Sequence, residues 1–169
     1  MYYRKIEGEK IYLSPMDKNN EIPLLTKWFN EDESIAYNNG FISSISNEEN
    51  ISETVDKWNE SGMIFSIINK ETDEFMGHVS FFGADNNKTF ITMGIYIAEE
   101  YRGNGYGLEA IKLSTEYMFR FHVYRSIHLE VFSYNEGAYR LYQKAGFKEC
   151  GRFHNSRYFN GKFYDIILM

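Results

Sequence analysis

The sequence has 169 residues, of which 43% are hydrophobic and 25% charged, so we expect a single domain over residues 1–169 with a buried core. Its net charge of −6 argues against nucleic-acid binding, which needs a cationic surface, and is compatible with a cationic small substrate. A single cysteine, Cys150, excludes an internal disulfide and a cysteine-cluster metal site, and the absence of long apolar runs or a signal-like start predicts a cytoplasmic protein without a membrane partner.

The first third of the chain predicts a short strand followed by two helices. Segment 10–15 predicts the strand, and 18–30 predicts a helix because its apolar residues recur on one face. Segment 31–45 has no clear period and predicts a loop, which at this length is often functional. Ser46 and Glu49 match the S-x-x-E capping box and place the start of the second helix there.

The rest of the chain predicts an α/β (α+β) fold with a mixed sheet. Segments 63–69, 75–83 and 89–98 are apolar and separated by short polar turns, which indicates an antiparallel meander. The later elements are a helix at 106–122, a strand at 126–133, a helix at 135–146 capped by Asn135, and strands at 147–154 and 161–169 around an Asn160-Gly161 turn. The strand, helix and strand between 89 and 133 predict a right-handed crossover with parallel strands.

A glycine-rich stretch, EEYRGNGYG (99–107), lies at the carboxyl end of one predicted strand and opens the next helix. Backbone N–H groups at a helix N-terminus bind anions, and glycine lets phosphate oxygens approach the main chain. The Walker pattern is absent, and in the dinucleotide pattern G-x-G-x-x-G the third glycine comes one residue early. The pattern R-x-x-G-x-G is matched by Arg102, Gly105 and Gly107, and the alternative is a plain tight turn.

The R-x-x-G-x-G pattern resembles the coenzyme A loop of the GNAT superfamily of N-acetyltransferases. The stretch NEGAYRLYQKAGF (135–147), about 30 residues later, resembles the second half of the same fold, an Asn followed by a helix with A-x-x-L-Y-x-K-x-G-F. The opening GEKIYLSP and the ending YFNGKFYDIILM are similar to the branch that acts on ribosomal-protein N-termini and polyamines. The resemblance covers nearly the whole chain, apart from 30–62.

The resemblance implies transfer of an acetyl group from acetyl-CoA to a primary amine, which is a polyamine, an aminoglycoside or a protein N-terminus, by direct attack of the amine. It also implies a single-domain GNAT fold with helices on both faces, a C-terminal hairpin, and a splayed parallel pair, here 89–98 and 126–133, that holds the pantetheine arm. The cofactor-binding residues that it implies are Ile95, Tyr96, Ile97, Arg102, Gly103, Asn104, Gly105, Tyr106, Gly107, Asn135, Ala138 and Lys144.

Tyr142 is the predicted catalytic residue, because the family often uses a tyrosine at this helix position to protonate the departing thiolate. A thiol has a pKa of about 8.5 and a tyrosine of about 10, so the transfer is uphill by roughly 2 kcal/mol. The alternative for Tyr142 is a packed aromatic.

Some relatives carry a glutamate as general base in the strand before the glycine loop, where this chain has Thr92, so no base is assigned and a water chain could replace it. The histidines, His78 among them, are predicted to be surface residues.

An acidic run, Glu31, Asp32 and Glu33, is the predicted substrate-binding feature, because it would attract a cationic acceptor; a solvated helix end is the alternative. The acceptor itself is expected against the loop 31–45 and the C-terminal hairpin.

The alternative to an enzyme is a non-catalytic acyl-CoA-binding sensor or regulatory module, which would keep the glycine loop and lack a proton path. Many relatives dimerise, so the resemblance makes a homodimer one candidate assembly, and the sequence itself does not determine the oligomeric state.

Overall fold

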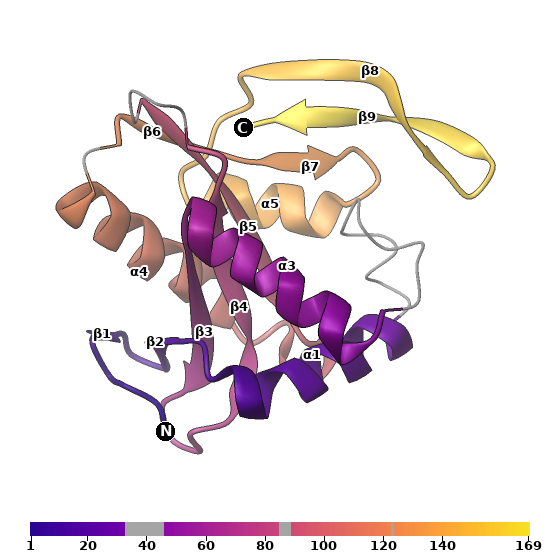
Figure 1. The fold of residues 1–169 in the computed structure, drawn as a ribbon. Helices are drawn as coiled ribbons and strands as arrows, with labels where there is room; N and C mark the ends of the chain where they lie inside the picture. The colour runs from indigo at the N-terminus through magenta and orange to yellow at the C-terminus, as the bar shows by residue number, and fades with distance from the viewer. Residues whose placement is uncertain (33–45, 85–88, 123) are drawn as a thin grey trace.

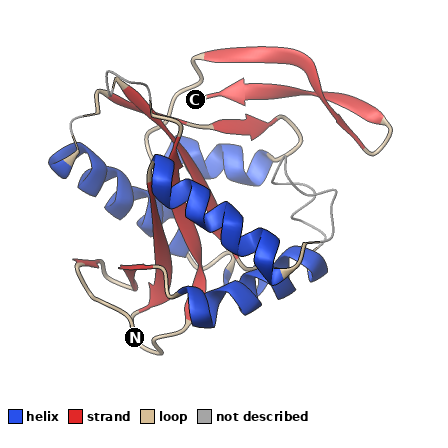
Figure 2. Cartoon of the chain, viewed as in Figure 1, coloured by secondary structure: helices blue, strands red, loops and turns tan. Residues whose placement is uncertain are grey.

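The computed structural model describes residues 1–32, 46–84, 89–122 and 124–169. Two sheets with helices on both faces confirm the α/β prediction (Figures 1 and 2). The six-stranded sheet has the order β1 (Ile6–Glu7), β2 (Ile11–Pro15), β3 (Met63–Asn69), β4 (Phe75–Phe82), β5 (Phe90–Ile97) and β6 (Ser126–His128). The three-stranded sheet has the order β7 (Glu130–Phe132), β9 (Lys162–Leu168) and β8 (Gly151–Phe159). The helices are α1 (Lys18–Glu31), α3 (Glu48–Ser61), α4 (Tyr106–Phe121) and α5 (Glu136–Lys144), with a 3₁₀ turn η1 (Glu99–Tyr101).

The antiparallel meander forms as predicted, since β3 pairs with β4 and β4 with β5, each antiparallel. The predicted strand at 10–15 is β2, which joins the meander along β3. The sequence analysis missed β1, because two residues are too short to show an alternating pattern. The apolar runs of β3 and β4 are buried nearly throughout, as expected for central strands covered on both faces.

The parallel pair is short and splits, and this split shapes the whole site. β5 and β6 pair in parallel only from Phe90 to Thr92. The single strand predicted at 126–133 is therefore wrong, because at Leu129 the chain exchanges both backbone hydrogen bonds with Met169, at 2.9 Å each, and continues as β7 beside β9. As a result, residues 93–97 of β5 have β4 on one edge and, among the described residues, no strand on the other.

Two helix starts test the predicted caps. The N-cap of α3 is Asn47 and not Ser46: the Asn47 side chain accepts a hydrogen bond from the Asn50 N–H at 2.8 Å, and the Asn50 side chain bonds back. The backbone of Ser46 is instead held by the side chain of Asn30, which moves the cap one residue along. The Asn135 cap of α5 is confirmed, because its side chain accepts from the Ala138 N–H at 3.1 Å.

The C-terminal hairpin is present, but its first strand is longer and later than predicted. β8 runs up to the turn, so that Phe159 pairs with Lys162, and the predicted bounds of 147–154 are wrong. Asn160 and Gly161 both have positive φ, 46° and 79°, which is the two-residue hairpin geometry that an Asn-Gly pair predicts. The turn sets the register, and so the polar segment before it is drawn into the strand.

Each face of the large sheet has its own apolar core. α4 and α5 pack on one face with the inward side chains of the strands, and α1 and α3 pack on the other, as the ribbon shows (Figure 1). The side chains of β5 alternate between the two cores: Met93, Ile95 and Ile97 face α4 and α5, and Tyr96 faces α1 and α3. Successive residues at the end of β5 therefore reach both sides of the sheet.

A carboxyl and an imidazole are buried beneath α1 and α3. Glu21 is fully buried and accepts a hydrogen bond from the Ser66 hydroxyl, and burial raises its pKa to about 7. His78 is also buried, between the rings of Trp58 and Tyr96, so the prediction of a surface position is wrong for it. Burial lowers the pKa of His78 to about 4, which keeps the imidazole neutral at pH 7.

Replacing Glu21 by Gln is expected to change how stability depends on pH. A carboxyl with a raised pKa binds more protons in the folded state, so wild-type stability falls as pH rises from 4.5 through about 7. The difference in unfolding free energy between Glu21→Gln and wild type should grow in favour of the variant by about 3 kcal/mol over that window. Urea unfolding at several pH values measures it; His78, whose effect has the opposite sign, is present in both proteins and cancels to first order. Parallel curves for the two proteins would contradict the assignment.

Candidate active site

A cavity of about 750 Å³ opens between the end of β5, the glycine-rich turn and α5. It brings together two segments that are far apart in the chain, the turn before α4 and the helix after β7. Its lining contains Tyr142 and every predicted cofactor-binding residue except Asn104: Ile95, Tyr96, Ile97, Arg102, Gly103, Gly105, Tyr106, Gly107, Asn135, Ala138 and Lys144.

The glycine turn is shaped by backbone requirements at two of its three glycines. Gly103 and Gly105 have φ of +80° and +87°, a region that disfavours any side chain with a Cβ. Gly105 is the N-cap of α4. The first N–H groups of the helix therefore have no acceptor within it, and they lie at the positive end of the helix dipole. A Cβ on Gly103 would meet nothing within 4 Å, so the outer face of the turn is open. Backbone geometry of this kind is typical of anion-binding turns.

Arg102 uses its guanidinium within the protein. Its Nε donates to the carbonyl of Ile97 at 2.8 Å, and its Nη2 contacts the Asp32 carboxylate at 2.6 Å. The family resemblance implies that Arg102 binds the cofactor, and in the structure the Asp32 carboxylate neutralises much of its positive charge. The guanidinium still lines the cavity, so Arg102 connects the site to the end of α1.

The acidic run is divided by this contact. Asp32 faces inward, with 6% of its side chain exposed, whereas Glu31 is exposed and lies 3.9 Å from Lys27. Glu33 and most of the predicted loop 31–45 lie outside the described residues. Asp32 is thus placed for contacts with the cavity wall, and the prediction that the run attracts a cationic acceptor stays a prediction for Glu31 and Glu33.

Lys10 is a neighbour of the glycine turn that the sequence analysis missed. Its Nζ donates to the carbonyl of Asn104 at 3.2 Å and lies 3.9 Å from where a Cβ on Gly105 would be. Its backbone N–H donates to Glu109 of α4, which fixes the start of β2 beside the turn. Asn104 itself turns its side chain toward the carbonyls of its own loop and away from the cavity lining. The sequence signal for Lys10 was the GEK opening, but a local sequence pattern does not show that Lys10 lies beside the glycine turn.

Tyr142 lies on the buried face of α5 and borders the cavity. Burial raises its pKa to about 12, so the hydroxyl keeps its proton through the neutral range. None of the described residues forms a hydrogen bond with this hydroxyl, which leaves it available to a ligand in the cavity. Tyr139 on the same helix instead donates to Glu149 at 3.3 Å, on the exposed side.

The described residues that line the cavity include no carboxylate and no imidazole, so none of them supplies a general base of either kind. Asp32 is not one of these residues and contacts the lining through Arg102. Thr92, at the position where some relatives carry a glutamate, lies in the paired part of β5 opposite His128. Within the described ranges, no three Asp, Glu, His or Cys side chains are grouped so that they could hold a metal ion.

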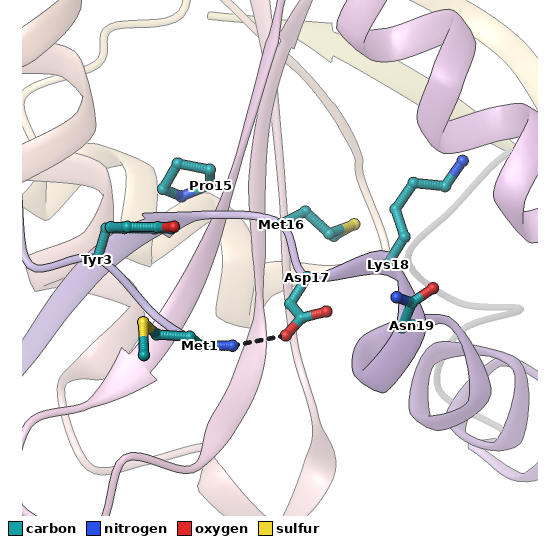
Figure 3. A pocket seen from close by; sticks show the side chains of 7 residues that line it. All are labelled: Met1, Tyr3, Pro15, Met16, Asp17, Lys18 and Asn19. Atoms are coloured by element: carbon teal, nitrogen blue, oxygen red, sulfur yellow. Dashed lines mark hydrogen bonds and ion pairs between the residues drawn. The ribbon is translucent and has the colours of Figure 1, made fainter.

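A second, smaller pocket of about 380 Å³ lies at the start of α1. The N-terminal amine lies 2.9 Å from the Asp17 carboxylate, and a dashed line marks this contact in Figure 3. It contains none of the predicted site residues; its lining is Met1, Tyr3, Pro15, Met16, Asp17, Lys18 and Asn19. Of the helices in the described part of the chain, none has the length and hydropathy needed to cross a bilayer.

The split sheet and the glycine turn beside it define an acetyltransferase domain. The family model "Acetyltransferase (GNAT) domain" matches residues 10–148, and the chain therefore belongs to the GNAT family. It is 31% identical over 106 residues to the SPbeta prophage-derived uncharacterized N-acetyltransferase YokL of Bacillus subtilis (strain 168), a match that covers 61% of this chain and 59% of that protein.

Two solved structures share the fold. The ribosomal L7/L12 alpha-N-protein acetyltransferase RimL in complex with coenzyme A superposes with a TM-score of 0.84 at 15% identity, covering 96% of this chain and 94% of RimL. The spermidine N-acetyltransferase of Vibrio cholerae in complex with CoA and spermine gives a TM-score of 0.82 at 19% identity, covering 95% and 94%. The GNAT fold inferred from the sequence is thus confirmed.

Proposed function

We propose that this protein transfers an acetyl group from acetyl-CoA to a primary amine. The observation that carries the proposal is the cavity itself, in which the open edge of β5, the N–H groups of the glycine turn and the Tyr142 hydroxyl border one space. Membership of the GNAT family supports the reaction class. The CoA complexes of RimL and of the Vibrio cholerae enzyme support the choice of cofactor.

The residues present fit such a cofactor. Residues 95–97 of β5 have backbone groups with no strand partner on the cavity side among the described residues, and these would bond the amides of the pantetheine arm. The N–H groups from Gly103 to Gly107 would bind the pyrophosphate, with Lys144 near the rim of the cavity as a further cation. Asn135 caps α5 and borders the same space, so the cap and the binding contact are compatible roles.

Tyr142 is the residue we propose for proton transfer. When bound, the cofactor supplies the thioester whose acyl carbon the amine attacks; the new C–N bond forms as the C–S bond breaks. The Tyr142 hydroxyl would donate a hydrogen bond to the sulfur as negative charge develops there. The proton released by the amine leaves by a route to water, because the described lining supplies no free carboxylate or imidazole to take it.

The acceptor belongs to the class of primary amines, and a polyamine, an aminoglycoside and a protein N-terminus are the candidates. The net charge of −6 favours a cationic acceptor. Changing Glu31 and Glu33 together to Gln is expected to raise the KM of a polyamine by about two- to fivefold and to leave the KM of acetyl-CoA unchanged, because charges that attract a ligand through solvent contribute little and are screened by salt. Initial rates at low and high salt measure this; an unchanged polyamine KM at low salt would exclude the electrostatic role.

A non-catalytic acyl-CoA sensor is the second candidate, and the missing general base favours it. The experiment that decides is a calorimetric titration with acetyl-CoA, with ATP and NAD as controls, followed by detection of CoA thiol release over a panel of polyamines, aminoglycosides and N-terminal peptides. Micromolar acetyl-CoA binding with thiol release supports the enzyme, and binding without release for any amine supports the sensor. No binding at millimolar acetyl-CoA would overturn both.

A further inference from the structure

The carboxylate of Asp32 accepts hydrogen bonds from two of the three parts of the chain that border the cavity, the end of β5 and the glycine turn. Arg102, the first residue of the glycine motif, reaches Asp32 Oδ2 through Nη2 at 2.6 Å. Tyr96, from the end of β5, donates its hydroxyl to the same oxygen at 3.2 Å. Asp32 is only 6% exposed, so this contact is shielded from solvent and from salt, unlike an ordinary surface ion pair.

Arg102 in turn spans the corner between the strand and the turn. Its Nε donates to the Ile97 carbonyl at 2.8 Å, and the guanidinium carbon lies 5.8 Å from the centre of the Tyr96 ring. Two directions of the planar guanidinium are therefore fixed, one by the end of β5 and one by Asp32. The next residue is Gly103, which lines the cavity and whose N–H group is one of those proposed to bind the pyrophosphate.

The end of α1 supplies a favourable place for this cation. Asp32 is the C-cap of α1, and its N–H donates to the Trp28 carbonyl at 2.8 Å. The last turn of α1 contains no basic residue of its own. The guanidinium of Arg102 thus provides the positive charge that the carbonyl end of a helix attracts.

We propose that Asp32 is a positioning residue of the cofactor site: it holds Arg102 so that the backbone from Ile97 to Gly103 keeps the shape that receives the pantetheine arm and the pyrophosphate. The inference rests on the proposed acetyl-CoA function. The inference predicts the direction in which the affinity for acetyl-CoA changes when Asp32 is replaced, and simple electrostatics predicts the opposite direction. Removing a negative charge near a phosphate site should tighten anion binding, whereas loss of a positioning contact weakens it.

The test is the affinity of the full-length protein for acetyl-CoA, measured by calorimetry. Asp32→Asn is expected to raise the Kd about tenfold, with kcat at saturating acetyl-CoA within about twofold of wild type. Arg102→Gln should also raise the Kd. The Kd of the double variant should be no higher than that of Arg102→Gln alone, because each substitution removes the same contact between Arg102 and Asp32. Asp56→Asn, which breaks the exposed 2.8 Å ion pair with Lys18, is the matched control and should leave the Kd unchanged, because neither residue lines the cavity.

An unchanged or lower Kd for Asp32→Asn, or additive effects in the double variant, would overturn the inference while wild-type binding keeps the proposed function intact. Failure of the wild-type protein to bind acetyl-CoA would overturn the proposed function instead. If Asp32→Asn does not fold, Tyr96→Phe tests the same carboxylate more gently, because it removes only the phenol hydroxyl that donates to Asp32. Its Kd should rise about two- to threefold, and an unchanged value would again overturn the inference.

Discussion

Replacing Tyr142 by Phe is expected to lower kcat by about 100-fold, within the range typical of general-acid assistance. Burial raises the pKa of Tyr142 to about 12, which makes full proton transfer to a thiolate uphill by about 5 kcal/mol, more than the sequence alone suggested. The hydroxyl therefore contributes mainly by donating a hydrogen bond to the sulfur as its charge develops. Because this bond strengthens only along the reaction, the Kd of acetyl-CoA should change by no more than about twofold.

Steady-state rates with the best amine of the panel measure the effect, and calorimetry measures the affinity. Tyr139→Phe is the matched control on the same helix, since its hydroxyl contacts Glu149 and does not border the cavity. It should retain the wild-type kcat. Equal kcat values for wild type and Tyr142→Phe would remove Tyr142 from the mechanism and leave it as a packed aromatic beside Phe147.

Replacing Gly105 by Val is expected to weaken acetyl-CoA binding by roughly 10- to 100-fold, the cost of losing one or two charge-assisted hydrogen bonds to main-chain N–H groups. Gly105 has φ of +87°, which a β-branched residue strongly disfavours, and the side chain would project toward the place where the phosphate approaches. Within the protein a Cβ there meets only Lys10 Nζ at 3.9 Å, so the loss falls on the ligand more than on packing.

Gly161→Val separates strain from ligand binding. Gly161 has a similar φ of +79°, has nothing within 4 Å of its Cβ position, and lies on the turn of the C-terminal hairpin. Both variants should lose comparable stability in thermal unfolding, but only Gly105→Val should lose affinity in calorimetry. Unchanged affinity of Gly105→Val would mean that the phosphates bind elsewhere.

Local backbone chemistry explains why part of the site could be predicted from the sequence. Gly103 and Gly105 adopt conformations that only glycine adopts easily, so the demand of the turn is visible in the residue type. Asn135 caps α5 through its own side chain within three residues. Signals of this kind depend on neighbours in the chain, and for the same reason the order of helices and strands could be predicted.

Long-range contacts explain what could not be predicted. The contact of Arg102 with Asp32 joins residues that are 70 positions apart, and no local pattern encodes it. The division of the predicted strand at Leu129 depends on its backbone pairing with Met169, which is distant in the sequence but adjacent in the structure. The burial of His78 depends on α3 covering β4, where Trp58 contacts the imidazole ring. The sequence around His78 does not show this contact, so its burial could not be predicted.

The split at Leu129 also explains how little side-chain chemistry this site displays. A strand that leaves its neighbour exposes peptide groups, which every residue type carries, so the surface that we propose for cofactor binding along 95–97 consists of main-chain groups. Side chains there are free to serve the two cores, as Ile95 and Tyr96 do on opposite faces. A surface of this kind requires the sequence to produce a particular backbone path, and it does not require particular reactive side chains.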